Sequence, residues 1–131
     1  MEKGYGGAER RRFARLPVSF TVFYRVDAPA IIRIKIGDKE IIAIASDISE
    51  GGMAIVTDCE IPAVSVISIK FVMLNDKAFD SSKQRHSITV QAEVRYNSAE
   101  RQGREYRMGV NFLDLSEEDR RFIHNFVSDN K

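Results

Sequence analysis

Four arginines near the start of the chain are the residues best suited to binding an anion. Arg10, Arg11, Arg12 and Arg15 lie within six positions, directly before a segment in which apolar residues alternate. Each guanidinium carries a permanent charge and a planar set of donors, which can bridge two phosphate oxygens or stack on a flat ring. A ligand with both phosphates and purine faces would use both properties. Taken alone, however, a basic stretch before a domain is usually a solvated tail or a nonspecific contact with nucleic acid.

A second group of polar residues forms the stretch 47–52, Asp-Ile-Ser-Glu-Gly-Gly. In an extended segment Asp47 and Ser49 project to the same face, so a carboxylate and a hydroxyl can meet a base edge or a ribose. Gly51 and Gly52 permit positive φ and let a ligand approach the main chain without an intervening Cβ. The alternative is a plain turn between two strands, because Asp, Ser and Gly favour turns for conformational reasons.

Patterns typical of catalysis or metal binding are poorly represented. His86, His124 and Cys59 are far apart in the sequence and lie in no zinc-binding or nucleophile motif. The Gly-rich loop ending in Lys-Ser/Thr, which phosphate-binding ATPases use, does not occur. We therefore expect no enzyme activity, no metal site and no cofactor.

The composition indicates one domain that does not bind nucleic acid through bulk charge. The 131 residues are 44% hydrophobic, enough for a core, and 20 Lys+Arg against 19 Asp+Glu leave a formal net charge of +1. The start lacks the apolar core of a signal peptide, and no apolar run approaches the ~20 residues needed to cross a bilayer. With Cys59 as its one cysteine, the chain is expected to be cytoplasmic, without membrane insertion and without a nucleic-acid partner.

The elements that must position these residues are mainly strands. The alternation of Ile32, Ile34 and Ile36 before Gly37 and Asp38 predicts an extra hairpin within residues 26–39. Similar apolar alternation predicts strands at about 18–25, 64–74 and 88–96, and further strands are expected at about 53–57 and 106–113. The stretch 40–48 is nearly all apolar or small, which predicts a strand buried on both faces.

The end of the chain and the longest polar stretch differ from this pattern. Residues 75–85 are polar and are expected to form an exposed loop, and residues 97–104 a charged turn. From about Ser116 to Ser128 apolar residues follow a helical period, and Ser116 with Asp119 resembles a capping box. This helix is expected to close one end of a barrel.

Together, the two motifs resemble those of the PilZ domain family, bacterial receptors of the second messenger cyclic di-GMP. The family's Arg-x-x-x-Arg motif matches Arg11 and Arg15, and its Asp/Asn-x-Ser-x-x-Gly motif matches Asp47, Ser49 and Gly52. The resemblance covers most of the chain, from about the arginine cluster to the terminal helix. All the motifs in register are more specific than any one alone.

A third, weaker signature of the family is Gly-x-x-Phe before an acidic helix start, met by residues 109–112 and 115–119. The resemblance implies an all-β fold, a six-stranded antiparallel β-barrel with one C-terminal α-helix. It implies a PilZ domain at residues 9–131, and we expect residues 1–8 to be a flexible tail. Cyclic di-GMP would bind on the outer surface of the barrel, with the N-terminal segment folded over it.

The resemblance also implies roles for single residues. The motif arginines would pair with phosphates and stack on guanine, the aspartate and serine would read a guanine edge and the backbone, and Gly52 would allow close main-chain approach. In the family, the residue before the first motif arginine influences whether one ligand or an intercalated pair binds, and Arg10 favours the pair. The ligand-binding residues implied are Arg10, Arg11, Arg15, Asp47, Ser49, Gly51 and Gly52, with Gly109 as a weaker candidate.

The leading hypothesis is a non-enzymatic receptor in which cyclic di-GMP orders residues 1–16 against the barrel and so signals to an unknown partner protein. The alternative is a protein-interaction adaptor of the same fold that does not bind the nucleotide, although intact motifs favour the receptor. A barrel that binds single-stranded nucleic acid would need basic and aromatic residues interleaved along a groove, and Phe13 alone lies in the arginine cluster.

Overall fold

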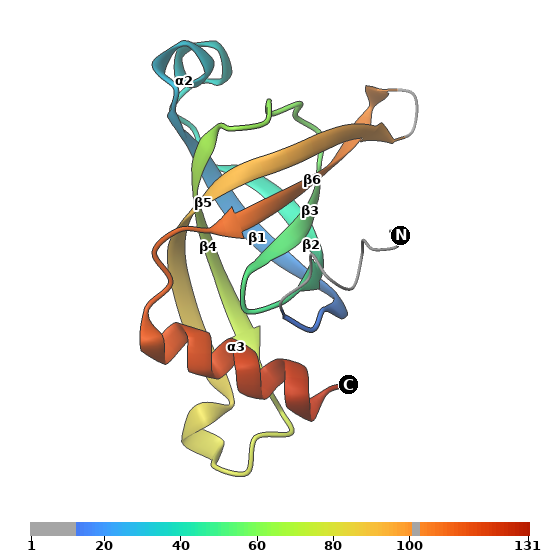
Figure 1. The fold of residues 1–131 in the computed structure, drawn as a ribbon, viewed down its shortest axis with the longest axis vertical. Helices are drawn as coiled ribbons and strands as arrows, with labels where there is room; N and C mark the ends of the chain where they lie inside the picture. The colour runs from blue at the N-terminus through green and yellow to red at the C-terminus, as the bar shows by residue number, and fades with distance from the viewer. Residues whose placement is uncertain (1–12, 101–102) are drawn as a thin grey trace, which may run out of the picture.

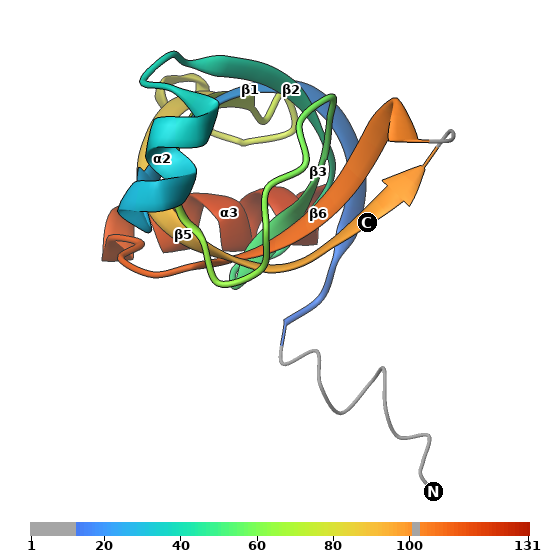
Figure 2. The ribbon, with the colours of Figure 1, turned by 90° about the horizontal axis from the view of Figure 1, so that it is seen from above.

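A computed structural model describes residues 13–100 and 103–131 of the protein. The strands in this part of the chain are β1 (Leu16–Ala28), β2 (Ile41–Ile48), β3 (Gly52–Thr57), β4 (Val66–Leu74), β5 (Arg85–Glu100) and β6 (Glu105–Phe112). They form a closed barrel in the order β1-β2-β3-β6-β5-β4, in which all neighbours are antiparallel. Figure 2 shows the strands as a ring around the core. The prediction of a six-stranded antiparallel barrel is confirmed.

The barrel interior is filled by alternate side chains of each strand, because residues two apart share a face. Tyr24 is fully buried among them, and its hydroxyl lies 2.8 Å from Thr57 Oγ1, so the one polar atom of this ring has a buried partner. The largest fully buried side chains of the strands are Tyr24, Phe71, Ile48, Met53, Ile55, Ile67, Ile69, Met73, Ile88 and Met108.

The predicted terminal helix is α3 (Glu117–Asp129), which lies across one end of the barrel (Figure 1). Ser116 caps it, since its Oγ accepts a 3.1 Å hydrogen bond from the Asp119 backbone N–H. Ile123 and Val127 on its inner face are buried in the core. His86 of β5 contacts the first turns of α3. Its Nε2 lies 2.7 Å from Asp119 Oδ1, and its ring stacks on that of Phe122 with 4.7 Å between the ring centres.

The predicted hairpin at residues 26–39 is wrong. β1 continues to Ala28, and the isoleucines that follow form a short helix, α2 (Ala30–Ile36), at the end of the barrel opposite α3 (Figure 1). Four isoleucines in six positions fit both the two-residue period of a strand and the 3.6-residue period of a helix. Here they form a helix. Ile32 and Ile36, one turn apart, pack against the core, whereas Ile31 and Ile34 are exposed. Gly37, with φ 101°, ends the helix.

Two smaller differences concern connections. β5 extends beyond the predicted end at residue 96, because Asn97 to Glu100 pair with residues of β6. The polar stretch 75–85 is largely a loop, as expected, and contains one 3-10 turn, η1 (Ser81–Lys83), capped by Asp80. None of the helices in residues 13–100 and 103–131 has the length and hydropathy that a membrane-spanning helix requires.

Candidate functional site

The structure brings together the second arginine of the first motif and the aspartate of the second. Pro17 pairs with Asp47 where β1 begins and β2 nears its end, so the residues just before β1 lie beside this part of β2. Arg15 Nη1 is 2.5 Å from Asp47 Oδ1, although the two residues are 32 positions apart in the sequence. The side chains are 30% and 18% exposed, so a polar ligand can reach the pair from outside the barrel.

A further arginine, which sequence reasoning missed, binds the same carboxylate. Arg107 Nη2 lies 3.2 Å from Asp47 Oδ2, and its Nη1 donates a 3.0 Å hydrogen bond to Ser46 Oγ. Asp47 thus has one arginine on each oxygen. In the sequence Arg107 looks like any charged residue on the solvent face of a strand. Only the pairing of β3 with both β2 and β6 places it next to Asp47.

The hydroxyl of Ser49 shapes the turn between β2 and β3. It accepts a 3.1 Å hydrogen bond from the Gly51 backbone N–H, and the Ser49 N–H donates to the Gly52 carbonyl at 2.9 Å. Ser49 is 4% exposed. The Ser49 hydroxyl is therefore buried in the turn and is not exposed beside the Asp47 carboxylate as expected. A ligand contact by Ser49 stays a prediction.

The two glycines of the turn are in close contact with other parts of the chain. A Cβ on Gly52 would overlap the carbonyl oxygen of Val110, because β3 and β6 pair closely here. A Cβ on Gly51 would lie 3.0 Å from the Phe13 ring. Phe13, which precedes Arg15 by two positions, thus lies over the turn and covers part of the second motif.

The weaker candidate, Gly109, lies in the same row of the sheet as Asp47. Strand pairing places Asp47, Ala54, Gly109 and Tyr96 opposite one another across β2, β3, β6 and β5. The Tyr96 ring covers Gly109, where any Cβ would overlap it. The close packing of Tyr96 therefore explains why a glycine occupies position 109. Tyr96, 46% exposed, supplies an aromatic face on this surface that the sequence did not single out.

The other predicted ligand residues, Arg10 and Arg11, lie outside the described residues, as does the predicted tail at residues 1–8. Of the predicted ligand-binding residues, the structure therefore describes Arg15, Asp47, the residues of the 49–52 turn and Gly109. In residues 13–100 and 103–131 no three His, Cys, Asp or Glu side chains are grouped to hold a metal ion.

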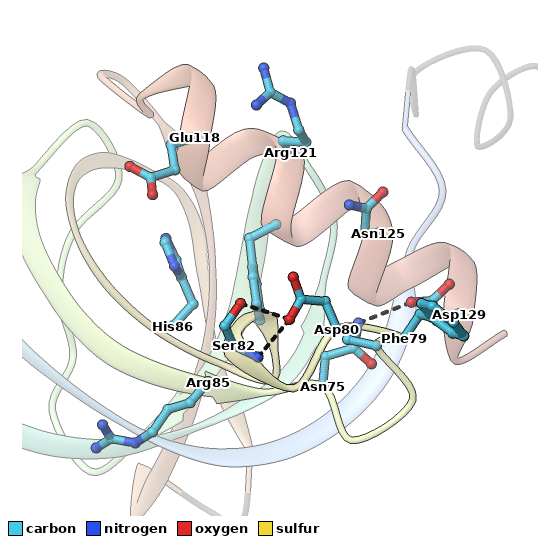
Figure 3. Close-up of a pocket in the computed structure, with 12 residues that line it drawn as sticks. Asn75, Phe79, Asp80, Ser82, Arg85, His86, Glu118, Arg121, Asn125 and Asp129 are labelled. Carbon is cyan, nitrogen blue, oxygen red and sulfur yellow. Dashed lines mark hydrogen bonds between the residues drawn. The ribbon is translucent and has the colours of Figure 1, made fainter.

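A cavity of about 500 Å³ lies elsewhere, between α3 and the 75–86 segment (Figure 3). Asn75 Nδ2 donates to Asp129 Oδ2 at 3.0 Å along one side, and Ser82 Oγ donates to Asp80 Oδ1 at 2.8 Å. No residue of either motif lines it. The cavity is separate from the surface that carries Arg15 and Asp47.

Comparison with known proteins agrees with this architecture. The family model described as PilZ domain matches residues 9–129. No curated protein sequence gives a significant match.

Solved structures share the fold at low identity. They include the inhibitor of motility MotI/DgrA of Bacillus subtilis, with 15% identity, a TM-score of 0.68, and coverage of 91% of this chain and 50% of that one. The PilZ domain of YcgR from Escherichia coli with c-di-GMP has 15% identity, a TM-score of 0.58 and coverage of 92% and 91%. The MrkH–c-di-GMP complex of K. pneumonia has 16% identity, a TM-score of 0.60 and coverage of 92% and 51%. The chain spans about half the length of MotI/DgrA and of MrkH.

Proposed function

The chain belongs to the PilZ domain family, and from this premise we propose that it is a non-enzymatic receptor of cyclic di-GMP that signals to a partner protein. The observation that carries the proposal is the contact between Arg15 and Asp47. It joins the two family motifs on the outer surface of the barrel, with the Phe13 ring over the turn of the second motif. The printed descriptions of the YcgR and MrkH structures, which share this fold, name c-di-GMP.

In this proposal each group meets the part of the ligand that suits its chemistry. Arg11 and Arg15 bind phosphate oxygens and stack on guanine, with Arg10 beside them. Asp47 accepts hydrogen bonds from the guanine edge. The 49–52 turn contributes through Ser49 and the backbone of Gly51 and Gly52, which the ligand reaches by displacing the Phe13 ring that lies over the turn.

The signal in this proposal comes from the segment before β1. In the free protein Arg15 is held by Asp47, so a phosphate must replace that contact and move the arginine. Its movement would order residues 1–16 over the barrel and alter the surface presented to the partner.

The second candidate is an adaptor of the same fold that does not bind the nucleotide. One observation favours it, since both oxygens of Asp47 already have arginine partners in the described chain. A ligand must compete with an ion pair that the protein makes within itself.

Isothermal titration with cyclic di-GMP distinguishes the two. Replacing Arg15 by Ala removes charge-assisted hydrogen bonds of roughly 1.5–3 kcal/mol, so we expect an affinity loss of about 10-fold to 100-fold. Part of this loss is offset, because the variant no longer has to break the Arg15–Asp47 pair. Arg11→Ala should lose a similar amount.

Arg25→Ala is the matched control, because Arg25 is an exposed arginine on β1 that pairs toward β4, away from Asp47. It should bind like the wild type. Equal affinities for wild type, Arg11→Ala and Arg15→Ala would refute the roles given to these two arginines. No binding by any of the three proteins would favour the adaptor. The same titration gives the number of ligands per site.

A further inference from the structure

Asp47 is bound by two arginines that differ in their freedom to move. Arg15 precedes β1, in the segment proposed to respond to the ligand. Arg107 lies within β6, where its backbone is paired with Val56 on one side and Ser98 on the other. In the proposed response a phosphate draws Arg15 away and frees Asp47 Oδ1, while strand pairing keeps the backbone of Arg107 in place.

Arg107 also fixes the orientation of the carboxylate. Its guanidinium spans two adjacent residues of β2, with Nη1 on Ser46 Oγ at 3.0 Å and Nη2 on Asp47 Oδ2 at 3.2 Å. A planar group held at two points can turn little, so the oxygen that it binds is held as well. Asp47 would then keep its charge compensated and its Oδ1 directed outward after Arg15 leaves.

We propose that Arg107 is a positioning residue that makes this site selective for guanine, by holding Asp47 ready to accept hydrogen bonds from the guanine edge. The inference rests on the proposed function and names what sets its base specificity. Guanine presents two adjacent donors, N1–H and the exocyclic amino group, and a charged carboxylate accepts from both. Adenine presents a lone pair at N1, which a fixed carboxylate repels. Without Arg107 the carboxylate can rotate, so it no longer meets the two guanine donors in a fixed geometry and discriminates less between the two bases.

The test compares cyclic di-GMP with cyclic di-AMP, which carry the same phosphates and differ in the base. Wild type should prefer the guanine ligand, and Arg107→Met should lower affinity for cyclic di-GMP by about 10-fold or more, given the strength of charge-assisted hydrogen bonds. Its affinity for cyclic di-AMP should change little, so the preference ratio falls. Arg107→Lys keeps the charge without the two-point contact and should have an intermediate ratio.

Two further variants separate positioning from other roles. In an Asp47→Asn background, Arg107→Met should leave the preference ratio unchanged, because the group that it positions has been altered. Ser46→Ala removes one of the two anchoring points and should lower the ratio less than Arg107→Met. If Arg107→Met does not fold, Arg107→Lys still tests the positioning role.

Each outcome decides between clear alternatives. An equal loss of affinity for both ligands would mean that Arg107 is simply another phosphate-binding cation, and the proposal would be overturned. An unchanged ratio in both Arg107 variants, with wild type binding cyclic di-GMP, overturns it while the receptor function stands. Binding of neither ligand by wild type overturns the receptor function and this inference together.

Discussion

Glu50 Oε2 lies 2.6 Å from His124 Nδ1, so a residue within the second motif is hydrogen-bonded to the middle of α3. The same turn touches Phe13 through Gly51 and β6 through Gly52. Three separate parts of the chain therefore meet at residues 49–52. A shift of this turn would therefore reach α3 through the contact between Glu50 and His124.

Replacing Glu50 by Ala should disconnect the turn from α3 at little cost in stability. His124 is 59% exposed, and partly exposed pairs of this kind contribute about 0–1 kcal/mol. We expect the free energy of unfolding to fall by less than about 1 kcal/mol. Hydrogen exchange near His124 should respond to cyclic di-GMP in wild type and respond less in the variant. Glu118→Ala, an exposed acid of the same helix, is the control, and a loss of the response there too would count against this coupling.

Gly52 should tolerate no side chain, whereas the adjacent Gly51 should. A Cβ on Gly52 meets the Val110 carbonyl, which strand pairing holds in place, so Gly52→Ala should cost about 1–3 kcal/mol of unfolding free energy or more. A Cβ on Gly51 meets the Phe13 ring, a side chain that can turn aside, and Gly51→Ala should cost under about 1 kcal/mol. Urea denaturation of both variants measures the difference. If both variants lost the same unfolding free energy, the close contact of Gly52 with β6 would not be what excludes a side chain there.

Tyr24 should make the fold sensitive to alkaline pH. Burial raises the pKa of its hydroxyl well above the usual range, with the hydrogen bond to Thr57 opposing the shift. An unfolded tyrosine loses its proton near pH 10 while the folded one keeps it, so this contribution to stability is complete below about pH 10 and declines above it. Above that pH the unfolding free energy should fall about 1.4 kcal/mol per pH unit more steeply in wild type than in Tyr24→Phe.

The matched comparison is needed because burial also raises the pKa of the Cys59 thiol, which acts in the same direction in both proteins. Denaturant titrations between neutral and strongly alkaline pH give the two slopes. Parallel slopes would show that Tyr24 ionises as readily in the folded protein as in the unfolded one.

The sequence predicted the elements whose period is unambiguous. The strand around residues 88–96 and the helix from Ser116 were recovered because their alternation and capping are local signals. The stretch containing Ile32, Ile34 and Ile36 was misjudged, because isoleucines at these positions satisfy both periods and the choice depends on packing against the core.

At the site, the residues that the sequence did not predict are those placed there by strand pairing. The sequence supplied Arg15 and Asp47 through spacing that resembles known motifs, but Arg107 and Tyr96 join the same surface only through the register of neighbouring strands. Likewise, the direction of the Ser49 hydroxyl follows from the turn that it stabilises. Alternation gives the face on which a residue lies, and its neighbours on that face depend on register.

The closed ring of strands has a mechanical consequence. Within the described chain every strand is paired on both sides, and a slip of one residue at any seam would turn core side chains such as Phe71 toward water. In the described chain the paired strands of the barrel thus form a stiff frame. Residues 13–15, α2 and α3 lie outside the ring, so a shift of any of them breaks no strand pair.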